Sequence, residues 1–197
     1  DFLGFKPDSD EWKVMALSAH DQKNIYDKKI QKIYKFYNGK FEIDLSYFDY
    51  YTFDRQKNFY SQKFLDLFGS PRKINQPITL KHRQIASAMQ RHFEKIILKL
   101  LEYLKKKSKY KNLILGGGAA MNCVFNGKLD GIKIFKDTHI SYAPDDSGVS
   151  VGAALLAYYT SKKNKYIAQQ IKHCYFGPEF SNNEIKNILV QNKINFT

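Results

Sequence analysis

The spacing of apolar residues predicts helices in the first half of the chain. Over residues 24–37, apolar and aromatic side chains recur every three or four positions, which is the period of an amphipathic helix. The same period predicts a helix over 56–68 that Gly69 closes. A long helix follows, with Thr79 as its N-cap and with lysines at 105–107 that suit the negative end of the helix dipole. The apolar stripe expected along this long helix consists of Ile85, Met89, Phe93, Ile96, Ile97, Leu100, Leu101 and Leu104.

Shorter apolar runs predict strands. Asn38-Gly39 lies between two aromatic segments and is a strong hairpin signal, with alternation over 41–45 supporting the strand after the turn. In the second half, residues 113–115 and 139–142 are short apolar runs, and each is followed by turn residues and then by a helical pattern. Strand, turn and helix in this order, twice, are typical of an α/β domain. The sequence therefore predicts the α/β class.

The first of these strands ends in three glycines, within LILGGGAAMNCVFN at 113–126. Glycine tolerates positive φ and lets the backbone approach a ligand closely, and a helix N-terminus favours an anion. Yet Gly116, Gly117 and Gly118 match neither the Walker A pattern nor GxGxxG. A tight structural turn and a phosphate or nucleotide loop therefore both stay open. Asn122 suits either a ligand contact or a cap.

The second strand is followed by PDDSG at 144–148. A carboxylate at this edge of a sheet is a hard-oxygen ligand for a cation, but Asp146 is equally suited to cap the next helix. The five histidines show no HxxxH or HxxH spacing, so no local metal site is predicted from them. Open α/β sheets bind ligands beyond the carboxyl ends of their strands. Both loops lie at such positions.

Composition narrows the choice of partners. No apolar run reaches about 18 residues, so neither a membrane span nor a membrane partner is expected. The net charge of +13 invites a nucleic-acid interpretation, but only four of the 32 basic residues are arginine and the lysines are scattered. A solvated basic surface is favoured over nucleic-acid binding. Cys123 and Cys174 form no metal-type pair, which favours a reducing cytoplasm.

Several segments, taken together and in this order, resemble one enzyme family. They are FLGFKPDSDEWKVMAL at 2–17, FGSPR at 68–72, LILGGGAAMNCVFNGKL at 113–129, YAPDDSGVSVGAAL at 142–155 and YFGPEFSNNEI at 175–185. The family is that of the O-carbamoyltransferases of the nodulation and antibiotic-tailoring type. The resemblance covers essentially the whole chain.

The resemblance implies a biosynthetic transferase of two domains. The large domain has the actin-like ATPase (ribonuclease H-like) fold, a short mixed sheet with flanking helices, and the smaller domain forms carbamoyl-adenylate from carbamoyl phosphate and ATP. The large domain then passes the carbamoyl group to a hydroxyl of a small molecule or saccharide with the help of a divalent metal, iron or another transition metal. Residues 1–165 would be the second half of the large domain, and 166–197 a linker and the start of the smaller one. The chain, which begins without methionine, would then be an inactive fragment that needs the N-terminal half and the C-terminal domain of the same protein.

The family's roles can be carried to matching positions of this chain. Gly116, Gly117, Gly118 and Asn122 correspond to its nucleotide-contacting loop, and Asp146 to its metal-binding aspartate. The paired metal histidines of the family belong to the half that this chain lacks, and no catalytic residue is assigned. Two alternatives stay open, a tRNA threonylcarbamoyl-transfer enzyme and a non-catalytic nucleic-acid-associated relative. The GPEFSNNEI segment argues against the first.

Overall fold

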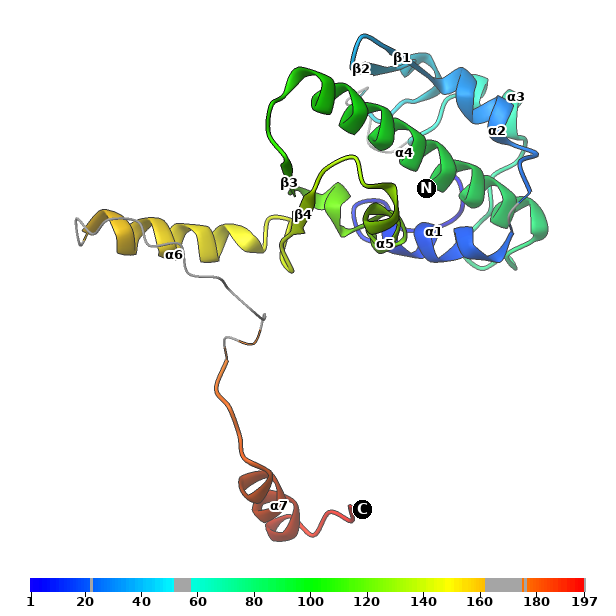
Figure 1. Cartoon of the computed structure of the whole chain (residues 1–197). Helices are drawn as coiled ribbons and strands as arrows, with labels where there is room; N and C mark the ends of the chain where they lie inside the picture. The colour runs from blue at the N-terminus through cyan, green and yellow to red at the C-terminus, as the bar shows by residue number, and fades with distance from the viewer. Residues whose placement is uncertain (22, 52–57, 162–174, 176, 197) are drawn as a thin grey trace. The chain divides into compact units, whose positions relative to one another are not determined.

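The computed structural model describes residues 1–21, 23–51, 58–161, 175 and 177–196 (Figure 1). It divides into two units, Asp1–Val149 and Ser150–Thr197. In the first unit, short helices precede a long one. They are α1 (Glu11–Leu17), η1 (Ser18–His20), α2 (Asp27–Ile30), η2 (Gln31–Ile33), η3 (Leu45–Tyr47) and α3 (Gln62–Phe68).

Of the helix predicted over 24–37, only residues 27–33 are helical, as α2 and η2. Tyr34–Tyr37 is a strand, β1, which pairs antiparallel with β2 (Lys40–Ile43). Asn38 and Gly39 between them have φ of 46° and 74°, so both adopt the left-handed conformation that a two-residue hairpin turn of type I′ requires. The turn therefore overrides the helical period of the residues before it, and the hairpin prediction is confirmed.

Helix α3 ends at the predicted residue but begins later than predicted. Ser61 caps it, because its hydroxyl accepts a hydrogen bond from the Phe64 N–H at 3.4 Å. Gly69 closes it with φ of +79°. The predicted start at Gln56 lies outside the described residues.

The long helix α4 (Leu80–Lys107) has the predicted N-cap, Thr79, and the predicted lysines in its last turn. The predicted stripe is only partly right, because Met89 and Leu104 are 46% and 45% exposed. Helix α4 packs against α1, η1 and α2, and much of the surface that it buries there is small or polar. The buried residues of its first half are His82, Gln84, Ile85, Ala86, Ser87, Ala88, Gln90 and His92. The spacing of apolar residues cannot predict such a face, because most of its buried residues are small or polar.

The second half of the first unit has the predicted α/β order. Strand β3 (Asn112–Leu115) leads through η4 (Gly118–Met121) into α5 (Cys123–Ile132), and then into β4 (Asp137–Ile140). The two strands are parallel, with Leu115 opposite Ile140. The α/β class is thus confirmed, whereas this strand pair by itself does not define an actin-like ATPase fold.

Two apolar clusters hold the first unit together, and α4 contributes to both. The larger one joins the first half of α4 to the N-terminal segments, and its buried members are Phe2, Leu3, Leu17, Ile30, Ile33, Tyr34, Tyr47, Phe68, Ile85, Ala86 and Ala88. The smaller one joins the second half of α4 to β3, α5 and the segment before β4, and its buried members are Leu101, Leu113, Phe125, Leu129 and Phe135. Helix α4 therefore fixes the β3–α5–β4 segment on the rest of the unit.

Two further helices follow. Helix α6 (Gly148–Ser161) begins at the end of the first unit, and α7 (Asn182–Gln191) lies in the second. A capping box begins α7, because the Ser181 N–H donates to the Glu184 carboxylate at 2.7 Å and the Glu184 N–H donates to the Ser181 hydroxyl at 3.3 Å. No helix in the described ranges combines the length and the apolar character that a membrane crossing needs.

Candidate functional site

The two loops that the sequence singles out meet at one edge of the parallel strand pair. The glycine loop (residues 116–118) follows β3, and the acidic turn (residues 144–148) follows β4. Because β3 and β4 run parallel in register, both loops leave from the same end. The Gly117 N–H donates to the Pro144 carbonyl at 2.6 Å. The structure thus joins the two loops at the carboxyl edge, where α/β sheets bind ligands.

The glycine loop presents open backbone. Gly117 has φ of +88°, a conformation that side-chain-bearing residues rarely adopt. A β-carbon at Gly117 or at Gly118 would have no neighbour within 4 Å. Internal packing therefore does not require glycine at these two positions. It leaves the backbone accessible to a ligand.

The acidic turn is built by Asp145 and Gly148. The Asp145 carboxylate accepts hydrogen bonds from the Ser147 hydroxyl at 2.5 Å and from the Ser147 N–H at 3.3 Å. The hydroxyl contact lowers the pKa of Asp145. Gly148 has no room for a β-carbon because the Ala143 carbonyl lies against it. Asp146 is exposed, and its backbone carbonyl accepts from the Val149 N–H at 3.1 Å.

Asp146 is the residue that the family resemblance assigns to a metal. The described residues contain no group of three or more His, Cys, Asp or Glu side chains that could hold a metal ion. Asp146 is a single carboxylate, and a stable metal site usually needs several ligands. The described residues therefore do not make a complete metal centre.

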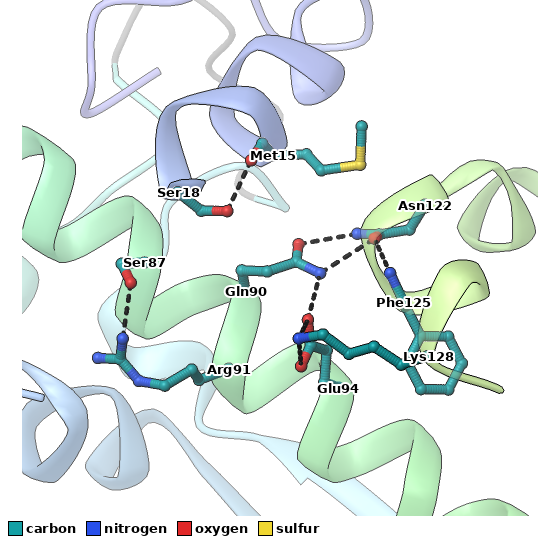
Figure 2. A network of polar contacts seen from close by, with 9 residues as sticks. All are labelled: Met15, Ser18, Ser87, Gln90, Arg91, Glu94, Asn122, Phe125 and Lys128. Atoms are coloured by element: carbon teal, nitrogen blue, oxygen red, sulfur yellow. Dashed lines mark hydrogen bonds and ion pairs between the residues drawn. The ribbon is translucent and has the colours of Figure 1, made fainter. Parts of the chain in front are cut away.

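Asn122 is held by a network between α4 and α5 (Figure 2). Its side-chain oxygen accepts from the Phe125 N–H and from the Gln90 amide, both at 3.0 Å, and its own amide donates to the Gln90 oxygen at 2.8 Å. Asn122 thus caps α5, and its amide pairs reciprocally with that of Gln90. Within the described structure, one N–H of the Asn122 amide remains for a further acceptor.

A second asparagine supports the segment that follows the glycine loop. The Asn126 amide donates to the Ala120 carbonyl at 2.6 Å and so anchors η4 to α5. The other end of the same side chain, the Asn126 oxygen, is buried and has no hydrogen-bond partner within the described part of the chain. An unpaired buried acceptor is costly, and a ligand that donates a hydrogen bond here would remove that cost.

Sequence reasoning missed Gln90 and Asn126. Gln90 stands in α4, where a glutamine is typical of a solvated face, and it lies 32 residues from Asn122, with no spacing rule to connect them. Asn126 is the last residue of the segment 113–126, but an asparagine inside a helix does not by itself indicate a functional role. Only the packing of α5 on α4 brings Gln90 to Asn122.

These loops lie at the carboxyl edge of an α/β domain, and comparison with known proteins gives its family. Residues 1–155 match the family described as carbamoyltransferase N-terminus, and the chain belongs to this carbamoyltransferase family.

Several relatives cover most of the chain. It is 33% identical to an uncharacterized protein of Synechocystis over 95% of its own length and 31% of that protein. It is 27% identical to nodulation protein NolO of Bradyrhizobium diazoefficiens, over 89% of the chain and 30% of NolO. It is 26% identical to nodulation protein NolNO of Sinorhizobium fredii, over 86% of the chain and 23% of NolNO. The chain thus spans a third or less of the length of these relatives.

Proposed function

We propose that this chain is part of an O-carbamoyltransferase that moves a carbamoyl group from carbamoyl phosphate, through an ATP-derived carbamoyl-adenylate, to a hydroxyl of a small molecule or saccharide. The observation that carries the proposal is the contact between the Gly117 N–H and the Pro144 carbonyl. It joins the glycine loop and the acidic turn into one ligand edge. Membership of the carbamoyltransferase family supports the reaction class.

In this proposal the glycine loop receives the adenylate. Backbone N–H groups at a glycine-rich strand end suit a phosphate because they offer positive partial charge without a side chain in the way. Gly116, Gly117 and Gly118 line the nucleotide, and the remaining N–H of the Asn122 amide donates to it. The unpaired oxygen of Asn126 would accept from a hydroxyl or amine of the same ligand.

The transfer step breaks one bond and forms one. The acceptor hydroxyl oxygen attacks the carbamoyl carbon, the bond from that carbon to the phosphate oxygen breaks, and AMP leaves while the hydroxyl proton passes to a base or to water. The loop's contribution is to hold the phosphate of the leaving AMP, whose negative charge the N–H groups of the loop other than that of Gly117 stabilise. Asp146 is proposed as one ligand of a divalent transition metal, with the other ligands supplied from outside this chain.

The proposal also covers the organisation of the protein. Residues 1–165 would form part of the large domain, and 166–197 a linker and the start of the adenylate-forming domain, so that the chain alone is inactive. The low cysteine content suits a cytoplasmic enzyme. The relatives are more than three times as long as the matched segment, which is consistent with a chain that acts as part of a longer protein.

The test uses the full-length protein that contains this chain. Incubation with ATP, carbamoyl phosphate and a panel of hydroxyl acceptors should release AMP and yield a carbamoylated product by mass spectrometry. Omission of carbamoyl phosphate is the control and should abolish the product. If neither AMP nor product forms with any acceptor, the proposal fails. Tight RNA binding that weakens steeply with salt, without AMP release, would favour the nucleic-acid-associated alternative.

A further inference from the structure

Helix α5, which follows the glycine loop and η4, is connected to α4 by one chain of hydrogen bonds that runs through Gln90 (Figure 2). The Phe125 N–H donates to the Asn122 oxygen at 3.0 Å, and the Asn122 amide donates to the Gln90 oxygen at 2.8 Å. The Gln90 amide donates back to Asn122 at 3.0 Å and onward to the Glu94 carboxylate at 2.9 Å. Glu94 also accepts from the Lys128 ammonium at 2.7 Å. Since Asn122 caps α5 and Lys128 belongs to it, the chain closes into a ring between two helices.

The orientation of both amides in this ring is determined by its ends. A backbone N–H can only donate, so Phe125 requires the oxygen of Asn122 to face it. An ionised carboxylate can only accept, so Glu94 requires the nitrogen of Gln90. Between these ends, only one arrangement of the two amides gives every contact a donor and an acceptor. If either amide were flipped, two donors or two acceptors would face each other.

Gln90 is buried, with 8% of its surface exposed, and both N–H groups of its amide are already used within the ring. It therefore has no free donor for a ligand at the glycine loop. Its link toward the loop runs through Asn122, the residue between η4 and α5 that caps both. A change at Gln90 leaves the contact from Phe125 to Asn122 in place, but it removes the two hydrogen bonds that hold the Asn122 amide against α4.

We propose that Gln90 is a positioning residue of the nucleotide site, which holds Asn122 and the end of the glycine loop in the geometry that receives the nucleotide. This inference rests on the proposed function. It adds a residue of α4, distant in sequence, to a loop whose family resemblance involves only residues 113–129.

The chain offers a matched control on the same helix. Gln84 is also a glutamine of α4 and is 6% exposed, but its amide donates to Asp21 at 3.4 Å, not to the glycine loop. Methionine replaces glutamine with an unbranched side chain of similar length and no hydrogen-bonding amide. Gln90→Met and Gln84→Met therefore each remove one buried amide from α4, and only the first removes the support of Asn122.

Two measurements on the full-length protein test the role. Titration with ATP should give about 10- to 100-fold weaker binding for Gln90→Met than for the unchanged protein, because small displacements of a binding group are costly. Gln84→Met should bind ATP normally, although it also loses a buried amide and its thermal unfolding shifts. Hydrogen exchange of the amides at 116–118, without nucleotide, should be faster in Gln90→Met alone.

The outcomes separate the two proposals. Equal ATP affinity and equal exchange in both variants would overturn the positioning role while leaving the proposed function intact. If the unchanged protein binds no ATP, the nucleotide site itself is refuted, and faster exchange in Gln90→Met would then show a purely structural clamp. Weak ATP binding in both variants, in proportion to lost stability, would also refute a specific role for Gln90.

Discussion

The Arg72 guanidinium donates a hydrogen bond to the Gly4 carbonyl at 3.0 Å, across 68 residues of sequence. The same buried group also donates to the carbonyls of Leu3 at 2.6 Å, Ile74 at 3.1 Å and Gln76 at 2.7 Å. Two of the segments that resemble the carbamoyltransferase family, FLGF and FGSPR, are therefore joined by one planar cation. Its fixed fork of five N–H donors suits several carbonyls at once.

This arrangement predicts that Arg72→Lys destabilises the protein although the charge is kept. A lysine ammonium is a point donor without the fork, so some of the buried carbonyls would lose their partner, each at a cost of about 1–3 kcal/mol. We expect the free energy of unfolding in urea to fall by about 2–4 kcal/mol. The exposed neighbour Lys73 is the control, and Lys73→Ala should change that free energy by less than about 0.5 kcal/mol. Equal stability of Arg72→Lys and the unchanged protein would contradict this role.

A histidine cap predicts that acid destabilises α4. The Thr79 N–H donates to the Nδ1 atom of His82 at 3.0 Å, so this nitrogen must carry no proton. Burial, and then the charges of Lys81 and Arg72, lower the pKa of His82. The unfolded chain therefore takes up a proton more readily than the folded one, so stability is complete above about pH 6.5 and is lost as the pH falls below it.

The matched variant is His82→Gln, because glutamine at this helix position also accepts from the N-cap backbone but does not titrate. Unfolding free energies measured between about pH 7.5 and pH 5 should fall less steeply for His82→Gln. Some slope should remain, because burial also lowers the pKa of His92. If both proteins lose stability equally over this range, the cap of His82 is not the cause.

The glycine loop gives a prediction with a control in the next helix. Gly117→Ala places a side chain at φ of +88°, which costs about 1–2 kcal/mol, and puts a methyl group where the nucleotide phosphate would approach. We expect the full-length protein to bind ATP at least about ten-fold more weakly. Gly127 lies inside α5 with open space around it, so Gly127→Ala should leave ATP binding unchanged and slightly stabilise the helix. Identical ATP affinity in the two variants would remove the glycine loop from the site.

Local chemistry explains which elements could be predicted from the sequence. Asn38-Gly39, Gly69 and Thr79 each determine the backbone around themselves, and the hairpin and the helix ends that they predict are present. The strand–turn–helix order around the glycine loop followed in the same way from short apolar runs and turn residues.

Two kinds of feature escaped prediction, contacts between distant segments and the side-chain geometry of a folded turn. The buried face of α4 is polar at Gln90 because the partner there is Asn122, and no periodicity in either segment reports that pairing. Asp145, and not Asp146, makes the side-chain contacts of the acidic turn, since the position of Ser147 after the strand decides which carboxylate it reaches. Two adjacent aspartates look alike in sequence and differ only once the turn is folded.

Because Asp145 and Asp146 differ in their contacts, we expect different effects from their substitution. In the full-length protein, Asp146→Asn should abolish carbamoyl transfer and lower the content of a bound divalent metal, because an amide is a weaker ligand than a carboxylate. Its thermal unfolding should stay unchanged, since Asp146 is exposed and contributes a backbone carbonyl to the turn, which asparagine retains. Asp145→Ala removes the acceptor of the Ser147 hydroxyl, so it should loosen the turn, lower the unfolding temperature and reduce both activity and metal content only in part. Full transfer activity and full metal content in Asp146→Asn would leave Asp146 as a residue of the turn alone.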